Sequence, residues 1–170
     1  MPSPTRSWRN GYHGYLSMTG RRQGLISAGC SATDSIGNRC QSAHLDEIMV
    51  LSFSHNLSNL GNTEQTTHRP ILITKYIDKA TPLLAEALTN REILECRINL
   101  YRINAAGKHE CYFKIDLSDA IIVDQRMEVP YSVLLNAQDP QEYLAIRYGF
   151  IAWHHLTANT SGYATWGDVA

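Results

Sequence analysis

Apolar and polar side chains alternate along much of this chain, and the alternation predicts β-strands. In residues 95–103, Cys96, Ile98 and Leu100 fall on one face with polar residues between them. Residues 111–117 repeat the pattern, and the short loop between the two runs contains a glycine, as longer hairpin loops commonly do. Because a period of two is the sequence signal of a half-buried strand, we expect a hairpin here.

The longest predicted strand runs from Glu142 to about Leu156. The residues expected on its inner face are Leu144, Ile146, Tyr148, Phe150 and Ala152. Ile151 departs from the alternation and, with Trp153, predicts partial cover of the outer face. Shorter apolar runs predict further strands at residues 15–19, 25–28, 48–57, 70–76 and 121–123.

One helix is predicted, from Pro82 to about Asn90. Thr81 is a good N-cap, and proline at the first helical position loses no hydrogen bond. The apolar residues of this segment form one stripe: Leu83, Leu84, Ala87 and Leu88. A helix this short does not persist alone in water, so it must pack against the sheet.

These elements predict a mainly β fold: a β-barrel of about eight strands with one short flanking α-helix. Closing the sheet removes edges that long strands would otherwise leave open to aggregation. A chain of 170 residues is most simply one domain, which we place at residues 12–170. Residues 1–11, rich in proline and serine, are predicted to be a disordered or atypical N-terminal segment.

Composition narrows the classes of function. Charged residues make up 18% of the chain against roughly 25% on average, so partners are expected to cover part of the surface. The net charge is −1 and no basic patch is present, so neither nucleic acid nor a polybasic membrane anchor is expected.

No apolar run approaches the roughly 20 residues that span a bilayer, so no membrane insertion is expected. The N-terminus lacks the apolar region of a signal peptide. The protein is therefore predicted to be cytoplasmic unless a machine independent of signal peptides exports it. The four cysteines contain no CxxC pair and fit reduced thiols, without a zinc ribbon or a thioredoxin-like motif.

The residues with catalytic potential form no convincing site. His154 and His155 are neighbours on a predicted strand, so their side chains point to opposite faces. The other histidines have no spacing that brings three or four metal ligands together. Cys30 lies in a small-residue turn with no following helix to lower its pKa. We therefore expect no metal, no cofactor and no enzymatic activity.

Residues 20–51 are predicted to run from a strand through a long polar loop into a second strand. Long loops in compact domains are uncommon and usually functional. This segment contains the motifs QGLISAG at 23–29, DSIGN at 34–38 and HLDEIMV at 44–50. Further distinctive motifs are HRPILITKYIDKATPLLAEAL at 68–88, the YR of INLYR at 101–102, LSDAIIVD at 117–124 and AWHHLTANTSGYATW at 152–166.

In the order and spacing of these motifs, the chain resembles the haemolysin-coregulated protein (Hcp) family, the inner-tube subunit of the type VI secretion system. The resemblance implies a β-barrel with a flanking helix and no catalytic residues. It implies homohexameric rings that stack into a hollow tube, a contractile sheath, a spike protein of the VgrG type, and secreted effectors in the lumen. It also implies secretion without a signal peptide.

Stacked rings need an element that reaches the next ring. We expect residues 30–47 to provide it, with Ser35, Asn38, His44, Asp46 and Glu47 as contact candidates. Three alternatives stay open: a small-ligand-binding β-barrel, a secreted hydrolase that uses Cys30 and a histidine, and the N-terminal tube domain of a fused effector.

Overall fold

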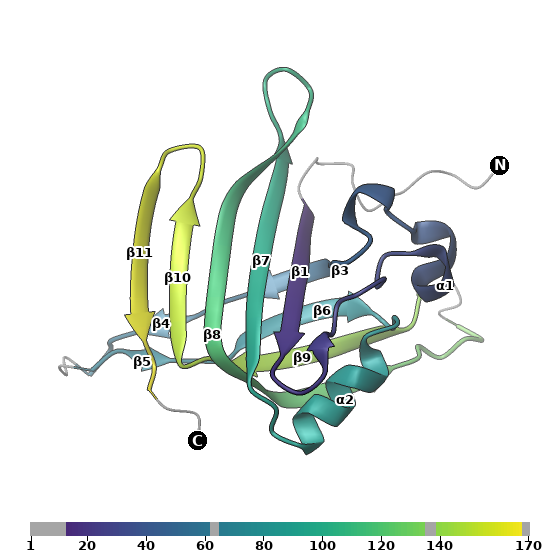
Figure 1. Ribbon diagram of the computed structural model, residues 1–170, viewed down its shortest axis with the longest axis horizontal. Coiled ribbons are helices and arrows are strands. Elements are labelled where there is room, and N and C mark those ends of the chain that lie inside the picture. The colour runs from purple at the N-terminus through teal and green to yellow at the C-terminus, as the bar shows by residue number, and fades with distance from the viewer. Residues whose placement is uncertain (1–12, 62–64, 135–138, 168–170) are drawn as a thin grey trace.

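The computed structural model describes residues 13–61, 65–134 and 139–167. In these residues the chain is mainly β, with one helix of more than a single turn (Figure 1). The predicted fold class, mainly β with a short flanking helix, is confirmed. The prediction for residues 1–11 falls outside the described residues.

The strands follow the chain in this order: β1 His13–Gly20, β2 Gly24–Leu25, β3 Ile48–Ser54, β4 Leu57–Ser58, β5 Thr67–His68, β6 Ile71–Tyr76, β7 Leu94–Ile103, β8 His109–Glu128, β9 Gln141–Arg147, β10 Phe150–His155 and β11 Thr160–Thr165. The helices are α1 Thr33–Ile36 and α2 Thr81–Thr89, and 3₁₀ turns occupy Gly37–Arg39 and Ser42–His44.

The main sheet closes on itself. Its order is β11-β10-β8-β7-β1-β3-β6-β9, and β9 pairs with β8 again. Strands β8, β7, β1, β3, β6 and β9 therefore form a closed circuit, and β10 and β11 continue from β8 as a two-stranded extension (Figure 1). All main-sheet pairings are antiparallel, so short connections suffice.

The core fills the inside of this circuit. Leu16, Ile98 and Ile146 are fully buried there, as period-two strands require. Helix α2 packs against β8 and buries Leu84 and Ala87 from its predicted apolar stripe. Burying one aliphatic side chain is worth roughly 1.5–3 kcal/mol, so packing rather than helix propensity holds this nine-residue helix.

Strand β8 runs continuously through the segment where two strands were expected. Its N-terminal half pairs with β7 and β10, and its C-terminal half pairs with β9. Asp119 adopts a φ of +50° between the two halves, where the register with β7 shifts. A bulge of this kind bends a strand and increases its twist, so one strand serves two parts of the circuit.

The predicted strand 142–156 is wrong as one element, because the chain breaks at residues 148–149 into β9 and β10. The backbone N–H of Gly149 donates to the carbonyls of Ser118 and Asp119 at 3.1 and 3.0 Å, which docks the break onto the bend of β8. The break resets the alternation. Phe150, expected inside, is 47% exposed, whereas Ile151 is fully buried.

Two smaller predictions also need correction. Thr81 is the first residue of α2 rather than its cap; Ala80 holds that position without a side-chain cap bond. The Thr81 hydroxyl instead accepts from the backbone N–H of Asp78 at 3.0 Å. Strand β11 was not predicted, and the expected strand 25–28 shrinks to the two-residue β2.

Candidate assembly interface

The segment expected to reach a neighbouring ring is folded rather than extended. Helix α1 and the two 3₁₀ turns occupy much of residues 30–47. Ser31 ties the two ends together: its N–H donates to the carbonyl of Leu45 at 3.1 Å, and its hydroxyl donates to the carbonyl of Glu47 at 2.6 Å. The segment therefore has a fixed shape against the barrel.

The contact candidates on this segment differ in exposure. Asn38 and Asp46 are exposed, although Asp46 accepts from the N–H of Gly29 at 2.9 Å. The Ser35 hydroxyl accepts from the N–H of Lys79 at 2.8 Å, which fastens α1 beside the start of α2. The structure thus leaves Asn38 and Asp46 at the surface and holds Ser35 beside α2. It does not gather the three residues into one cluster.

His44 and Glu47 are only partly exposed, because they pack at the end of β1. His44 Nδ1 lies 2.9 Å from Glu47 Oε1, and its ring stacks on Tyr15 at 3.7 Å between centroids. Burial, with a smaller contribution from Glu47, raises the pKa of Tyr15 to about 12. These two candidates therefore support the fold locally.

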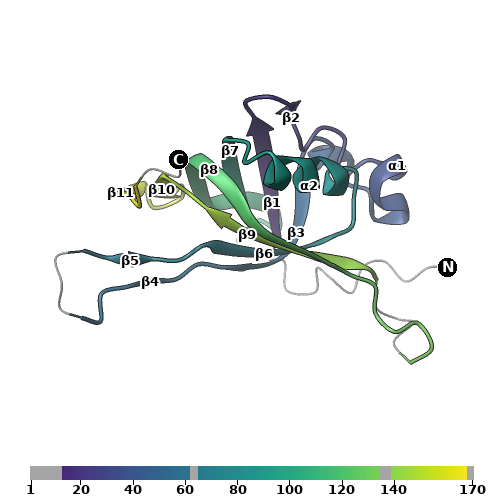
Figure 2. The same cartoon turned by 90° about the horizontal axis from the view of Figure 1, so that it is seen from below.

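A different element, a hairpin, also projects from the barrel. The hairpin of β4 and β5 extends away from the other strands (Figure 2). Two leucines on it face solvent, Leu57 at 41% and Leu60 at 93% exposed. Sequence reasoning did not single out this hairpin, although the two leucines stand out in an otherwise polar stretch.

A second apolar surface lies at the other end of the molecule. The chain leaving β8 exposes Val129, Tyr131, Val133 and Leu134. This end and the projecting hairpin lie at opposite ends of the molecule's long axis (Figures 1 and 2). A pocket beside Val129 is also lined by Ile36, Tyr76 and Ile77, with an Arg39–Asp139 ion pair at its rim.

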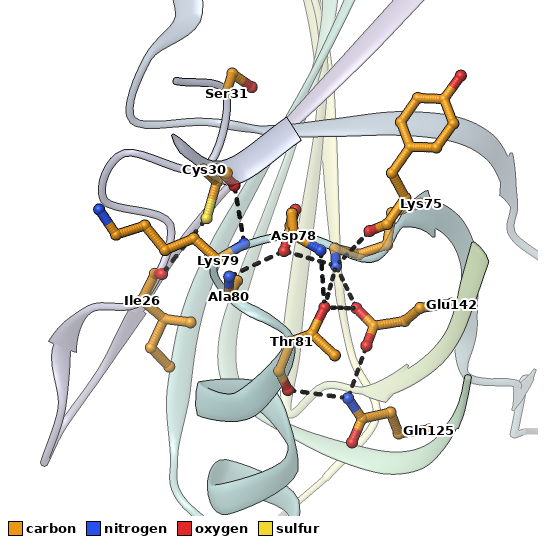
Figure 3. A network of polar contacts seen from close by, with 12 residues as sticks. Ile26, Cys30, Ser31, Lys75, Asp78, Lys79, Ala80, Thr81, Gln125 and Glu142 are labelled. Carbon is orange, nitrogen blue, oxygen red and sulfur yellow. Dashed lines mark hydrogen bonds and ion pairs between the residues drawn. The ribbon is translucent and has the colours of Figure 1, made fainter. Parts of the chain in front are cut away.

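Inside the barrel lies a charged network that the sequence analysis missed (Figure 3). The side chains of Lys75 and Glu142 are fully buried and form an ion pair. Lys75 Nζ also donates to Asp78 Oδ1 at 2.9 Å, and Gln125 Nε2 donates to Glu142 Oε2 at 2.8 Å. Burial raises the pKa of Asp78, and the charge of Lys75 opposes that rise. The network joins β6, β8, β9 and the start of α2.

The candidate nucleophile Cys30 is buried at 1% exposure. Burial, with a smaller contribution from Asp78, raises its pKa to about 12. Its thiolate, the form that attacks, is therefore strongly disfavoured at neutral pH. In the part of the chain that the structure describes, no three His, Cys, Asp or Glu side chains could hold a metal ion, and no helix is long and apolar enough to span a membrane.

Comparison with known proteins gives consistent relatives. Residues 15–155 match the family model described as "Type VI secretion system effector, Hcp". The chain is 40% identical over 166 residues to the "Major exported protein" of Pseudomonas aeruginosa, covering 89% of this chain and 94% of that protein. It is 40% identical over 146 residues to the uncharacterized protein YhhZ of Escherichia coli, covering 86% of this chain but only 36% of YhhZ.

A solved structure agrees with these relatives. The "Secreted protein Hcp3 from Pseudomonas aeruginosa" superposes with a TM-score of 0.81 at 39% identity, covering 91% of this chain and 98% of that one. The family match covers most of the chain, and the fold and the sequence identity point the same way. The chain belongs to the Hcp family of type VI secretion system proteins.

Proposed function

We propose that this protein is the tube subunit of a type VI secretion system, forming homohexameric rings that stack into a hollow tube. The observation that carries the proposal, beyond family membership, is the pair of apolar surfaces at opposite ends of the molecule. Two different patches that complement each other make a heterologous contact, which closes a ring or extends a stack. Exposed apolar patches mark interaction sites in proteins, and these two surfaces are the candidates for one in this chain.

Two elements are candidates for the contact between rings. One is the folded segment 30–47, with Ser35, Asn38, His44, Asp46 and Glu47 as the contact residues. The other is the projecting β4–β5 hairpin, whose Leu60 is 93% exposed. A charge at Leu60 would disturb an apolar contact with a neighbour while leaving the core untouched.

Deletion and substitution separate the two candidates. If the folded segment carries stacking, deleting residues 35–43 leaves single rings that no longer form tubes. If the hairpin makes the contact between rings, Leu60→Asp leaves single rings that no longer form tubes. Asn59→Asp, which adds a charge at a neighbouring exposed position that is already polar, is the matched control. Negative-stain microscopy of each variant distinguishes tubes, rings and separate chains.

The tube works with partners in this proposal. A VgrG-type spike caps it, a contractile sheath propels it, and secreted effectors travel in its lumen. Export of the tube subunit agrees with the name of the Pseudomonas aeruginosa relative, "Major exported protein". We assign the chain no catalytic role, since Cys30 is buried away from solvent.

The direct test is the assembly of the purified chain. Native mass spectrometry should show a species of six chains, and negative-stain images should show annular particles. A chain that stays single at every concentration, with no rings on the grid, would overturn the proposal and favour the small-ligand-binding barrel.

A second candidate follows from YhhZ, of which this chain spans only 36%. The same fold can form part of a longer protein, as in the tube domain of a fused effector. Mass spectrometry of the native protein from its source cell distinguishes the two, because a fused effector yields peptides beyond the present sequence.

A further inference from the structure

The projecting hairpin is attached to the barrel by two histidines and a buried tyrosine. His55 precedes β4 and His68 ends β5, so one histidine stands on each arm of the hairpin at its root. His55 Nε2 lies 3.1 Å and His68 Nδ1 lies 2.8 Å from the hydroxyl oxygen of Tyr148. Tyr148 is fully buried at the break between β9 and β10, so the hydroxyl is a fixed anchor.

Two tryptophans hold the imidazole rings in place. His55 stacks on Trp153 and His68 stacks on Trp166, each with 5.8 Å between ring centroids. Trp153 comes from β10, and Trp166 follows β11. The hairpin root is therefore fastened to the two-stranded extension as well as to the barrel.

The hydrogen bonds to Tyr148 depend on the protonation of the two rings. A tyrosine hydroxyl has one proton, so it can donate to one histidine while it accepts from the other. This arrangement requires at least one neutral imidazole. If both rings become imidazolium cations, every ring nitrogen is a donor. The hydroxyl proton of Tyr148 then has no acceptor within the cluster.

The electrostatic surroundings also favour neutral rings. Burial lowers the pKa of both histidines, and for His55 the charge of His68 adds to that effect. The guanidinium of Arg147 lies 4.8 Å from the Trp166 ring, and its Nε has no hydrogen-bond partner in the described residues. No carboxylate contacts His55, His68 or Tyr148 among the interactions of those residues, so nothing there compensates added positive charge.

We propose that His55 and His68 form a protonation-sensitive clamp, which fixes the β4–β5 hairpin to the barrel while the rings are neutral and weakens when they take up protons. The direction follows from linkage. A histidine whose pKa is lower in the folded protein binds fewer protons there than in the opened state. Its contribution is therefore complete above the ordinary value of 6.5 and declines as the pH falls below it.

Hydrogen exchange of the hairpin tests the clamp directly. After correction for intrinsic exchange, opening of residues 55–61 and 65–68 should increase between about twofold and tenfold from pH 7.5 to pH 5.5, because each pKa unit is worth up to tenfold. In the double variant His55→Gln/His68→Gln, which has no titrating ring, the opening should no longer change with pH. His109→Gln, on β8 away from the clamp, should keep the response of the original protein.

Two outcomes would overturn the clamp: equal hairpin opening at both pH values, or a double variant that keeps the pH response. A second measurement does not depend on the folding of variants. Imidazole NMR signals of His55 and His68 should titrate below pH 6.5 in the unsubstituted protein, and titration at or above that value would also refute the proposal.

The consequence for assembly rests on the proposed function, in which the hairpin contacts a neighbouring subunit. Exchange should be measured on separated chains and on separated rings. A hairpin that opens with falling pH in a chain that forms no rings supports the clamp and refutes the tube. Rings whose hairpin opens equally at both pH values would support the tube and refute the clamp.

Discussion

The buried charges give the sharpest prediction, because they can be removed one at a time. Replacing Lys75 by Met should destabilise the protein far more than replacing Glu142 by Gln. Among the described residues, Lys75 is the one cation of this network, and its ammonium pairs with two carboxylates, those of Asp78 and Glu142. Without it, both acids lie in the barrel with no counter-charge.

The expected magnitude follows from that geometry. Removing one partner of a buried ion pair costs about 3–5 kcal/mol, and Lys75→Met should reach that range at pH 7.5. For a chain of this length it corresponds to a fall in Tm of about 6–20 °C. Glu142→Gln leaves Lys75 paired with Asp78 and keeps an oxygen for its ammonium. It should cost about 1–3 kcal/mol, because Gln125 then faces an amide donor.

The loss should also depend on pH. In Lys75→Met the charge that opposes the burial of Asp78 is gone, so the folded protein would retain a proton on Asp78, whereas the unfolded chain releases it above about pH 4. The folded variant therefore binds more protons, and its stability falls as pH rises. The gap between variant and original protein should be smaller at pH 4.5 than at pH 7.5, and the effect of the histidine clamp cancels in that difference.

The assay is urea unfolding, monitored by circular dichroism. It should be run at several protein concentrations, because assembly adds apparent stability by mass action. Lys79→Met is the matched control, since Lys79 is 52% exposed and pairs with Asp34 only at the surface. It should cost at most about 1 kcal/mol. If Lys75→Met were no more damaging than Glu142→Gln, the reasoning on uncompensated buried charge would be refuted.

Three further predictions test the facing of the strands, the break and the thiols. Ile146→Asp should prevent folding because its side chain is fully buried, whereas Phe150→Asp should fold, since Phe150 is 47% exposed; circular dichroism distinguishes them, and a folded Ile146→Asp would contradict the facing of β9. Gly149→Ala should cost about 1–3 kcal/mol in urea unfolding, because a Cβ there would lie 3.0 Å from a side-chain carbon of β8, whereas Gly162→Ala meets nothing closer than 3.9 Å and should be nearly neutral. Cys40 should react with a thiol reagent in the native single chain much faster than the buried cysteines, and equal rates would show that the core opens readily.

The alternation of apolar and polar side chains predicts much of the fold, and the same pattern indicates the charged network. Lys75 has the same parity as Ile71 and Ile73, which point inward on β6. Glu142 has the same parity as Leu144 and Ile146 on β9. Two opposite charges at inward positions of predicted strands therefore indicate a buried pair, and the strands do place Lys75 directly opposite Glu142.

The elements that sequence reasoning missed lack a local signal. Strand β11 is exposed along nearly its whole length, so its side chains have no reason to alternate. The order within residues 30–47 comes from tertiary hydrogen bonds, such as that between Ser35 and Lys79, rather than from helix propensity. A four-residue helix such as α1 is below the length at which periodicity can be read.

The failure of the pattern at residues 148–149 has a physical cause that also bears on function. Gly149 bonds to a bend in β8 that is distant in sequence, so no window around residue 149 could reveal the break. The break lets Tyr148 complete the inward run of β9 while its hydroxyl meets both arms of the projecting hairpin. Local rules are expected to fail where a structure is shaped for function. Here the failure coincides with the anchor of the projecting hairpin. If that hairpin contacts a neighbouring subunit, as proposed above, its root is the place where assembly and protonation are expected to be coupled.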